Sequence, residues 1–293
     1  MTTARYLDRL AARTASVGNV LCVGIDPDPA ALPSGFPATL DGVERFCRLL
    51  LEASLPYAAA VKPNLAFFEA HGSSGIAVLE RLRAAVPSTV PFVADAKRGD
   101  IGSTAERQAV ALYDVLGADA ITVNPYLGEE AVAPLLARED RFAYILCRTS
   151  NPGAAELQDL EVAPNAATDA PREPLWARVA RRATAWGPGG TVGLVVGATA
   201  PRELSTIRAI APGLAFLVPG VGAQGGELAP VLEAGPATAA PAGGPAGGGL
   251  LVNVSRGIAR AAAGDSPAGT SADPGERLGR AAAEWARSLA VLP

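Results

Sequence analysis

The sequence has one histidine, His71, and three cysteines, Cys22, Cys47 and Cys147, among its 293 residues. The cysteines show no CxxC spacing, so they indicate neither a disulfide framework nor a zinc site, and we expect reduced core thiols. No Cys, His or carboxylate cluster surrounds His71, which removes support for histidine acid–base chemistry and for Ser-His-Asp hydrolysis. We therefore expect no metal site and interpret His71 as a surface or helix-capping residue.

Long apolar runs and a positive net charge are also absent. No run of about 18 apolar residues could span a membrane. The N-terminal stretch carries Arg5, Asp8, Arg9 and Arg13 where a signal peptide has an apolar core. With a formal net charge of −4, the chain has no positive field with which to hold a polyanion. We expect a cytoplasmic protein that binds neither membranes nor nucleic acid.

Hydrophobic residues make up 49% of the chain and gather in eight short runs rich in Val, Ile, Leu and Ala. Most runs end in polar or Gly/Pro residues and precede a stretch with helical spacing. Near-continuous apolar strands favour a parallel sheet covered by helices, so eight such units predict an α/β protein, a single-domain (β/α)₈ TIM barrel over residues 1–293. The predicted strands are Val20–Asp26, Tyr57–Asn64, Pro91–Lys97, Ala120–Asn124, Phe142–Ser150, Val192–Thr199, Ala215–Gly220 and Leu250–Arg256.

Helical spacing predicts helices between these strands and after the last one. They are Asp41–Ala53, Gly75–Ala85, Ser103–Leu116, Arg202–Ile210 and Glu276–Ala290. Two regions interrupt the pattern. Asn151–Gly190 is long enough for a lid or an extra helix, and its basic stretch Arg172–Arg182 is typical of the solvated face of a helix. Gly235–Gly249 is a Gly/Pro/Ala tract with few side chains to pack, which predicts a mobile insertion without chemistry.

The most informative segment, DAKRGD, follows the third apolar run. Barrels of this kind hold their active sites at the carboxyl ends of the strands. Residues i and i+2 of a strand share a face, so Asp95 and Lys97 project together, and Lys62 ends the neighbouring strand. Asp100 lies beyond the turn and faces the same site or a neighbouring subunit. Four charges at this position favour catalysis over a structural ion-pair network, because they are costly to desolvate.

Alternating lysines and aspartates suit a reaction in which negative charge leaves one substrate atom and a proton arrives there. Nearby carboxylates favour the protonated form of a lysine, which can then donate its proton. The same carboxylates disfavour a class I aldolase, because a Schiff-base lysine at position 62 or 97 has to be neutral to attack.

Glycine-rich turns follow the seventh and eighth strands, at residues 219–226 and 253–257. Many barrels bind phosphate at these two loops, where glycine lets backbone N–H groups approach closely. Arg256 adds a bidentate fork for a phosphate dianion and Gln224 adds a neutral donor. No GxGxxG opens a helix after the first strand and no GxxxxGK[ST] P-loop is present, so dinucleotide and P-loop sites are not indicated. The placement of the turns and Arg256 predict a phosphorylated small molecule as the ligand.

Together these residues resemble the orotidine 5′-phosphate decarboxylase family, especially its longer bacterial branch. The resemblance covers nearly the whole chain. Its motifs are FVADAKRGDIGSTA at 92–105, GID at 24–26, VKPN at 61–64, PGVG at 219–222 and VSRG at 254–257. It implies decarboxylation of orotidine 5′-monophosphate to UMP and CO₂ in de novo pyrimidine biosynthesis, with no cofactor.

The resemblance also implies roles for the charged residues. Lys97 is the acid that protonates C6, Asp95 lies against the departing carboxylate, and Lys62 and Asp100 complete the network. Members of the family are homodimers with shared active sites, in which this last aspartate crosses into the partner's site.

Other residues receive substrate-binding roles from the same resemblance. Ile101 and Thr104 cross to the partner's site with Asp100, Ile101 to line the pocket near the carboxylate and Thr104 to reach the ribose. The remaining assignments are Asp26 to the ribose, Ser150 to the pyrimidine amide, Gln224 with Arg256 to the phosphate, and Pro219 to the wall of the substrate site.

Two further interpretations stay open. One is a Mg²⁺-dependent sugar-phosphate decarboxylase or aldolase of the related barrel group, which uses a similar DxKxxD segment. That group places an acidic metal ligand near the end of the second strand, where this chain has Lys62, which would repel a cation. The other is a non-catalytic nucleotide-binding barrel.

Overall fold

A parallel sheet of eight strands forms the centre of the computed structural model, which describes residues 4–164, 171–222, 224–263 and 273–291. The strand order is β2-β1-β10-β9-β8-β5-β4-β3. The strands are β1 (Leu21–Ile25), β2 (Ala60–Pro63), β3 (Val93–Arg98), β4 (Ala120–Val123), β5 (Phe142–Arg148), β8 (Val192–Val196), β9 (Ala215–Val218) and β10 (Leu251–Val254). Parallel bridges from Val61 to Phe92 and from Asn64 to Asp95 join β2 to β3 and close the barrel. The predicted (β/α)₈ barrel is confirmed.

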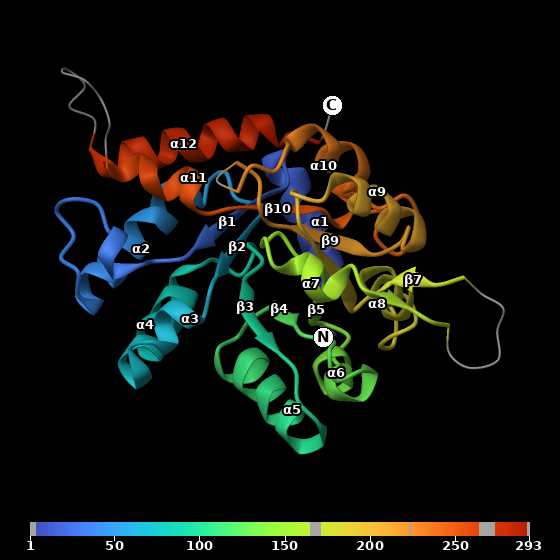
Figure 1. The fold of residues 1–293 in the computed structure, drawn as a ribbon. Coiled ribbons are helices and arrows are strands. Elements are labelled where there is room, and N and C mark those ends of the chain that lie inside the picture. Colours follow the sequence, from blue (N-terminus) through green and yellow to red (C-terminus); the bar gives the residue numbers. More distant parts are fainter. Residues whose placement is uncertain (1–3, 165–170, 223, 264–272, 292–293) are drawn as a thin grey trace.

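Helices cover the outside of the barrel (Figure 1). The α-helices are α1 (Tyr6–Val17), α2 (Leu40–Ser54), α3 (Ala66–Glu69), α4 (Gly72–Ala85), α5 (Gly102–Ala109), α6 (Glu129–Leu136), α7 (Ala154–Gln158), α8 (Leu175–Ala183), α9 (Pro201–Ile210), α10 (Leu228–Ala234), α11 (Arg256–Ala259) and α12 (Pro274–Ser288). A π-helical segment, Val110–Val115, continues α5, and 3₁₀ turns lie at Pro29–Ala31, Ala246–Gly249 and Arg260–Ala263. None of the helices in the described part of the chain is long and apolar enough to cross a membrane.

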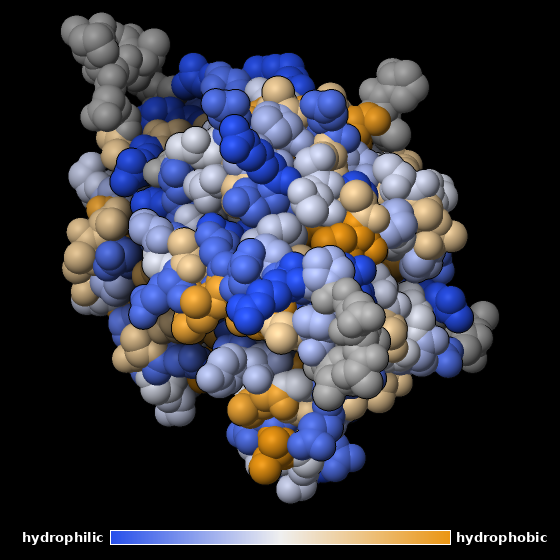
Figure 2. All heavy atoms as spheres, turned by 45° about the vertical axis from the view of Figure 1, so that its right-hand side comes forward, coloured by the Kyte–Doolittle hydropathy of each residue, from blue (hydrophilic) through white to orange (hydrophobic). Residues whose placement is uncertain are grey.

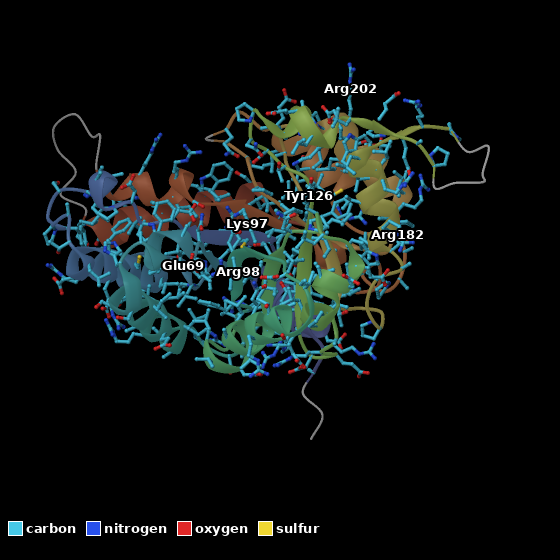
Figure 3. The ribbon with its side chains drawn as sticks, turned by 60° about the horizontal axis from the view of Figure 1, so that its bottom comes forward. Glu69, Lys97, Arg98, Tyr126, Arg182 and Arg202 are labelled. Carbon is cyan, nitrogen blue, oxygen red and sulfur yellow. The ribbon has the colours of Figure 1, made fainter. Side chains whose placement is uncertain are left out.

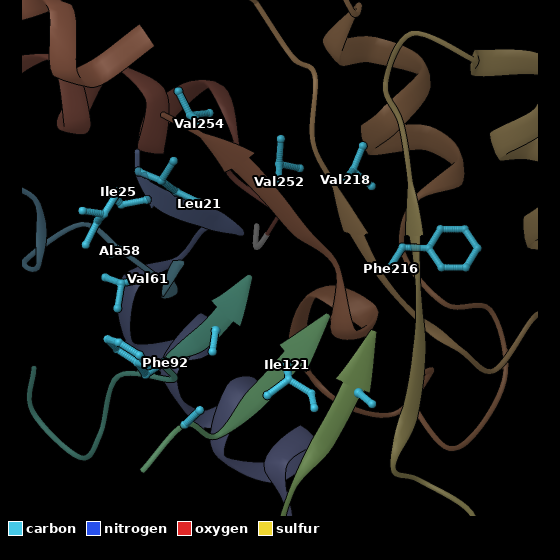
Figure 4. Close-up of a cluster of buried hydrophobic side chains, with 14 of the residues drawn as sticks. Leu21, Ile25, Ala58, Val61, Phe92, Ile121, Phe216, Val218, Val252 and Val254 are labelled. Atoms are coloured by element: carbon cyan, nitrogen blue, oxygen red, sulfur yellow. The ribbon is translucent and has the colours of Figure 1, made fainter. Parts of the chain in front are cut away.

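The strands are apolar along their whole length because both of their faces are covered. Neighbouring residues of β10 show this: Val252 packs in the layer between strands and helices, whereas Leu251 packs inside the barrel. Figure 4 shows part of the outer layer, including Val61, Ile121 and Val252 from three different strands. This alternation turns the polar residues at the strand ends toward the mouth of the barrel.

The segment between β5 and β8 holds more than one crossover helix. It contains α7, a short antiparallel pair of β6 (Glu161–Val162) with β7 (Glu173–Pro174), and α8. The prediction of an extra helix is therefore confirmed. Trp176 and Ala180 of α8 are buried while Arg181 and Arg182 are exposed, as predicted for a solvated helix face.

The amino end of the barrel is closed by α1 and by the tract 235–249. Tyr6 lies in the barrel interior, stacks on Phe142 with ring centroids 4.7 Å apart, and shares a hydrogen bond of 3.1 Å with the hydroxyl of Tyr144. Ala237 and Ala242 of the tract belong to the same interior cluster. The tract has few side chains to pack, as expected, but these two small ones fit against the floor of the barrel, which argues against the expected mobile insertion.

Candidate active site

Two adjoining cavities open at the carboxyl ends of the strands, with volumes of about 150 and 390 Å³. Both are lined by Lys62, Asp95, Ser150 and Pro219. The smaller also has Asp26, Gly220, Val221, Gln224, Asn253, Ser255, Arg256 and Gly257 in its wall, and the larger has Lys97, Thr122, Leu146, Thr149, Asn151, Gln158, Val195 and Leu217. Eight of the predicted site residues thus meet here.

Cavity size alone does not locate this site. A larger cavity of about 600 Å³ lies at the opposite end of the strands, beside Pro56 before β2 and Pro87 before β3. It contains none of the predicted site residues. The single histidine, His71, lies at the start of α4 and lines neither cavity at the barrel mouth.

Asp95 stands between two lysines. Its Oδ2 is 2.7 Å from Nζ of Lys62 and its Oδ1 is 2.6 Å from Nζ of Lys97. Lys62 is 4% exposed, whereas the side chain of Lys97 is 51% exposed and faces the larger cavity. Beside the array, Arg98 pairs with Glu69 of α3, which ties the end of β3 to the neighbouring helix (Figure 3).

The chain contains only two lysines, and both of them pair with Asp95. Apart from His71, every other basic side chain is an arginine, whose guanidinium stays charged and does not release a proton near neutral pH. Lysine and arginine can both provide a positive charge at the surface. The use of lysine at these two positions therefore indicates a need for a compact ammonium group. The presence of only two lysines can be read from the sequence, and it supports the assignment of Lys62 and Lys97 to the active site.

Burial and charge act in opposite directions on the array. Burial alone would raise the pKa of Asp95, but the charges and hydrogen bonds of Lys62 and Lys97 outweigh it and hold this pKa well below its usual range. Burial alone would lower the pKa of Lys62, but Asp95 and Asp26 raise it above its usual value. Asp95 and Lys62 therefore stay ionised across the ordinary pH range.

The other end of the smaller cavity is built from the loops after β9 and β10. Ser150 donates a hydrogen bond of 2.8 Å to Oε1 of Gln224, next to Arg256 in the same wall. Gly220 has a φ of 98°, and a Cβ there would lie 2.9 Å from Oε1 of Gln224. A side chain at position 220 would therefore be strained and would displace the glutamine.

Three predicted site residues do not reach the cavities of their own chain. Asp100 accepts a hydrogen bond of 2.8 Å from the N–H of Ile101 in its own loop. Ile101 is 59% exposed and Thr104 is exposed as well. All three lie outside both cavity walls.

Two polar residues of the cavities are not among the predicted site residues. Thr122 of β4 is 2% exposed and its hydroxyl donates to Oδ1 of Asp95 at 2.8 Å. Asn253 of β10 is 9% exposed and lines the smaller cavity, and its buried Oδ1 has no hydrogen-bond partner. Each is a polar residue inside an apolar run, which is the one signal that could have found them.

The described residues offer no assembled metal site, since no three His, Cys, Asp or Glu side chains among them are grouped to hold an ion. The three cysteines are free and buried, as predicted. Burial raises the pKa of the Cys22 thiol to about 12, so this thiol below the site stays protonated.

A family model of orotidine 5′-phosphate decarboxylase / HUMPS proteins matches residues 19–268. The chain belongs to this family. Orotidine 5′-phosphate decarboxylase of Roseiflexus castenholzii is 48% identical over 218 residues, which span 74% of this chain and 77% of the relative. The enzyme of Thermomicrobium roseum is 45% identical over 231 residues, which span 78% and 80%.

Solved structures of the orotidine 5′-phosphate decarboxylase family agree with the fold. OMP decarboxylase of Leishmania donovani is 39% identical with a TM-score of 0.78, covering 98% of each chain. A Toxoplasma gondii structure titled as a putative orotidine-monophosphate-decarboxylase is 37% identical with a TM-score of 0.83, covering 97% of this chain and 94% of that chain. The resemblance found in the sequence motifs is confirmed.

Proposed function

We propose that the chain decarboxylates orotidine 5′-monophosphate to UMP and CO₂, a step of pyrimidine biosynthesis. Membership of the family and the relatives named as this enzyme support the reaction. The observation that carries the assignment to these residues is the Lys62–Asp95–Lys97 array, which lies where the two cavities meet. No cofactor enters the proposal.

In this proposal the substrate spans both cavities. Arg256 and Gln224 hold the phosphate, Asp26 binds the ribose and Ser150 binds the pyrimidine amide, with Pro219 in the wall between them. The pyrimidine then lies in the larger cavity, against Lys97 and Asp95. Binding energy from the remote phosphate fixes the position of the reacting carbon.

The reaction breaks the bond between C6 and the carboxylate, leaves the electron pair on C6 and releases CO₂. The ammonium of Lys97 then gives a proton to C6, which yields UMP, and the lysine regains a proton from water. Asp95 repels the carboxylate in the ground state but not the departing neutral CO₂, so its charge favours the transition state. The charges hold one another in place before the substrate arrives, which limits reorganisation during the reaction.

The active enzyme is proposed to be a homodimer with shared sites, formed by a second copy of the chain. Four large apolar side chains are exposed on the segments after β3 and β4: Ile101 at 59%, Val115 at 68%, Tyr126 at 81% and Leu127 at 52%. Figure 2 shows hydrophobic side chains gathered at the lower end of the molecule, where α5 lies in Figure 1. Asp100, next to Ile101, would enter the partner's cavity together with Ile101 and Thr104.

The proposal treats the chain as one cytoplasmic barrel domain with an insertion at 235–249. Tract residues Ala237 and Ala242 belong to the interior cluster, and the N–H of Ala237 donates to the carbonyl of Gly248 at 3.0 Å. These contacts support a structural role for the insertion at the floor of the barrel, far from the two cavities at its mouth.

The test follows the loss of orotidine 5′-monophosphate absorbance in the presence of EDTA. Wild-type protein is expected to turn over, and Lys97→Ala to lose about 10²- to 10⁴-fold in kcat, as expected for loss of a general acid. Lys97→Arg keeps the charge without a transferable proton and is expected to be as impaired. Arg287→Ala, at an exposed position of α12, is the control.

Two outcomes would contradict the proposal. If the protein is inactive in EDTA and Mg²⁺ gives it activity on a sugar phosphate, it would instead be a metal-dependent enzyme of the related barrel group. Tight binding of UMP by a wild-type protein that decarboxylates nothing would instead indicate a non-catalytic nucleotide-binding barrel.

A further inference from the structure

The hydroxyl of Thr122 joins two residues of the charged array. It donates to Oδ1 of Asp95 at 2.8 Å and accepts the backbone N–H of Lys97 at 3.0 Å. A hydroxyl has one proton to give and lone pairs with which to accept, so both bonds form at the same oxygen. Thr122 itself is 2% exposed at the wall of the larger cavity.

The hydrogen bond from the backbone N–H of Lys97 to Thr122 replaces a bond to a strand carbonyl, which the sheet does not provide at this position. The register between β3 and β4 shifts between Ala94 and Arg98, so the ladder is interrupted where Lys97 lies. Its N–H is bonded to a threonine side chain instead of to a strand carbonyl. The hydroxyl therefore secures the end of β3 at the point where regular pairing stops.

The backbone of Lys97 is strained at this point. Its φ is 48°, and it is the one residue other than glycine with a positive φ among the residues that the structure describes. This conformation is unfavourable for a residue with a Cβ and persists where its surroundings hold it. The bond to Thr122 is a hydrogen bond that opposes relaxation of this backbone.

We propose that Thr122 is a positioning residue of the decarboxylation, an inference that rests on the function proposed above. Its hydroxyl fixes both the rotamer of Asp95 and the backbone of Lys97. The carboxylate and the ammonium therefore keep the same distance and orientation to each other while the substrate reacts. A residue that only filled this space would be replaced without loss by valine, which has nearly the same shape.

The test compares Thr122→Val, Thr122→Ala and Thr122→Ser with wild type. Val and Ala are expected to lower kcat about ten- to a hundredfold, the size expected for a lost hydrogen bond to a charged group. Ser restores the hydroxyl and is expected to remain within about threefold of wild type. KM and UMP affinity change little, because the phosphate end keeps its contacts. Thr191→Val is the control, since Thr191 is equally buried and its hydroxyl has no hydrogen-bond partner in the described structure.

A second readout does not depend on turnover. The backbone amide of Lys97 is expected to exchange its hydrogen at least about tenfold faster in the Val and Ala variants, and at the wild-type rate in Ser and in Thr191→Val. Unchanged exchange in Val and Ala, or equal loss of kcat in Ser and Val, would overturn the proposal. An inactive wild type whose exchange follows the expected pattern would refute the proposed reaction while supporting the positioning role.

Discussion

Asp95 is the residue on which the site is centred. Its Oδ2 accepts a hydrogen bond from the ammonium of Lys62. Its Oδ1 accepts hydrogen bonds from the ammonium of Lys97 and from the hydroxyl of Thr122. With both oxygens engaged, its charge is fixed in position and in direction. That arrangement suits a carboxylate which must stay ionised next to an anionic substrate.

The charge of Asp95 is expected to stabilise the fold as well. Its lowered pKa adds stability above about pH 4, the unfolded value, and this contribution is lost as the pH falls further. Asp95→Asn leaves Lys62 buried without its main partner, which is expected to cost about 3–5 kcal/mol of unfolding free energy at pH 7. Urea unfolding at pH 7 and pH 3 measures the free energy of unfolding of wild type and of Asp95→Asn. The difference between the two proteins should be smaller at pH 3.

Glu52→Gln removes an exposed carboxylate of α2 and serves as the control for this experiment. Its unfolding free energy is expected to stay within about 0.5 kcal/mol of wild type at both pH values. A deficit for Asp95→Asn that is equally large at pH 3 would contradict the assignment of the effect to ionised Asp95.

The residues at strand ends could be predicted from the sequence, because an apolar run that stops at a charged residue marks the mouth of a parallel barrel. Lys62, Asp95 and Lys97 follow from that rule. Thr122 and Asn253 do not, since each stands inside a run and its direction depends on the register of neighbouring strands.

At the scale of elements, the C-terminal helix α12 supports the loops after β9 and β10, to which the proposed function assigns the phosphate. The ring of Trp285 in α12 lies 3.1 Å from where a Cβ of Gly222 would stand and 3.0 Å from that of Gly257. One side chain thus packs behind the loop after β9 and the loop after β10. If these loops hold the phosphate, as proposed, the distance between them and the fit of the phosphate depend on this contact.

Trp285→Ala is therefore expected to raise KM about ten- to a hundredfold with a smaller change in kcat, because misplaced loops weaken phosphate binding. Trp285→Phe keeps an aromatic ring against the glycines and should lie near wild type. Steady-state kinetics measure the effects on KM and kcat separately, and UMP titration measures the affinity for the product. A loss confined to kcat would show that α12 does not act through the phosphate end.

Strands and helices could be predicted at this scale because periodicity reports which face is buried. The tract 235–249 could not, because its composition describes a flexible linker while its packing comes from elsewhere. Arg208 of α9, 6% exposed, donates to the carbonyls of Ala234 and Gly235 where the tract begins. Contacts between distant segments of this kind leave no trace in local composition.

At the scale of the whole molecule, one barrel does not contain all of the predicted site. Asp100, Ile101 and Thr104 leave their own chain's cavities and lie beside exposed apolar side chains. A second copy of the chain resolves both features at once, since it would cover the apolar surface and receive Asp100. Composition and periodicity do not report a contact between two copies, and the expectation of a dimer comes from the family resemblance alone.

A shared active site is tested most directly by mixing two inactive variants, Lys97→Ala and Asp100→Asn, after joint unfolding and refolding. Each variant alone is expected to be inactive. Half of the dimers in an equal mixture pair one variant with the other, and one of the two sites in such a dimer has both Lys97 and Asp100. Activity on orotidine 5′-monophosphate should then return to about a quarter of wild type. A mixture that forms these dimers yet stays inactive would contradict a charged array shared between two copies of the chain.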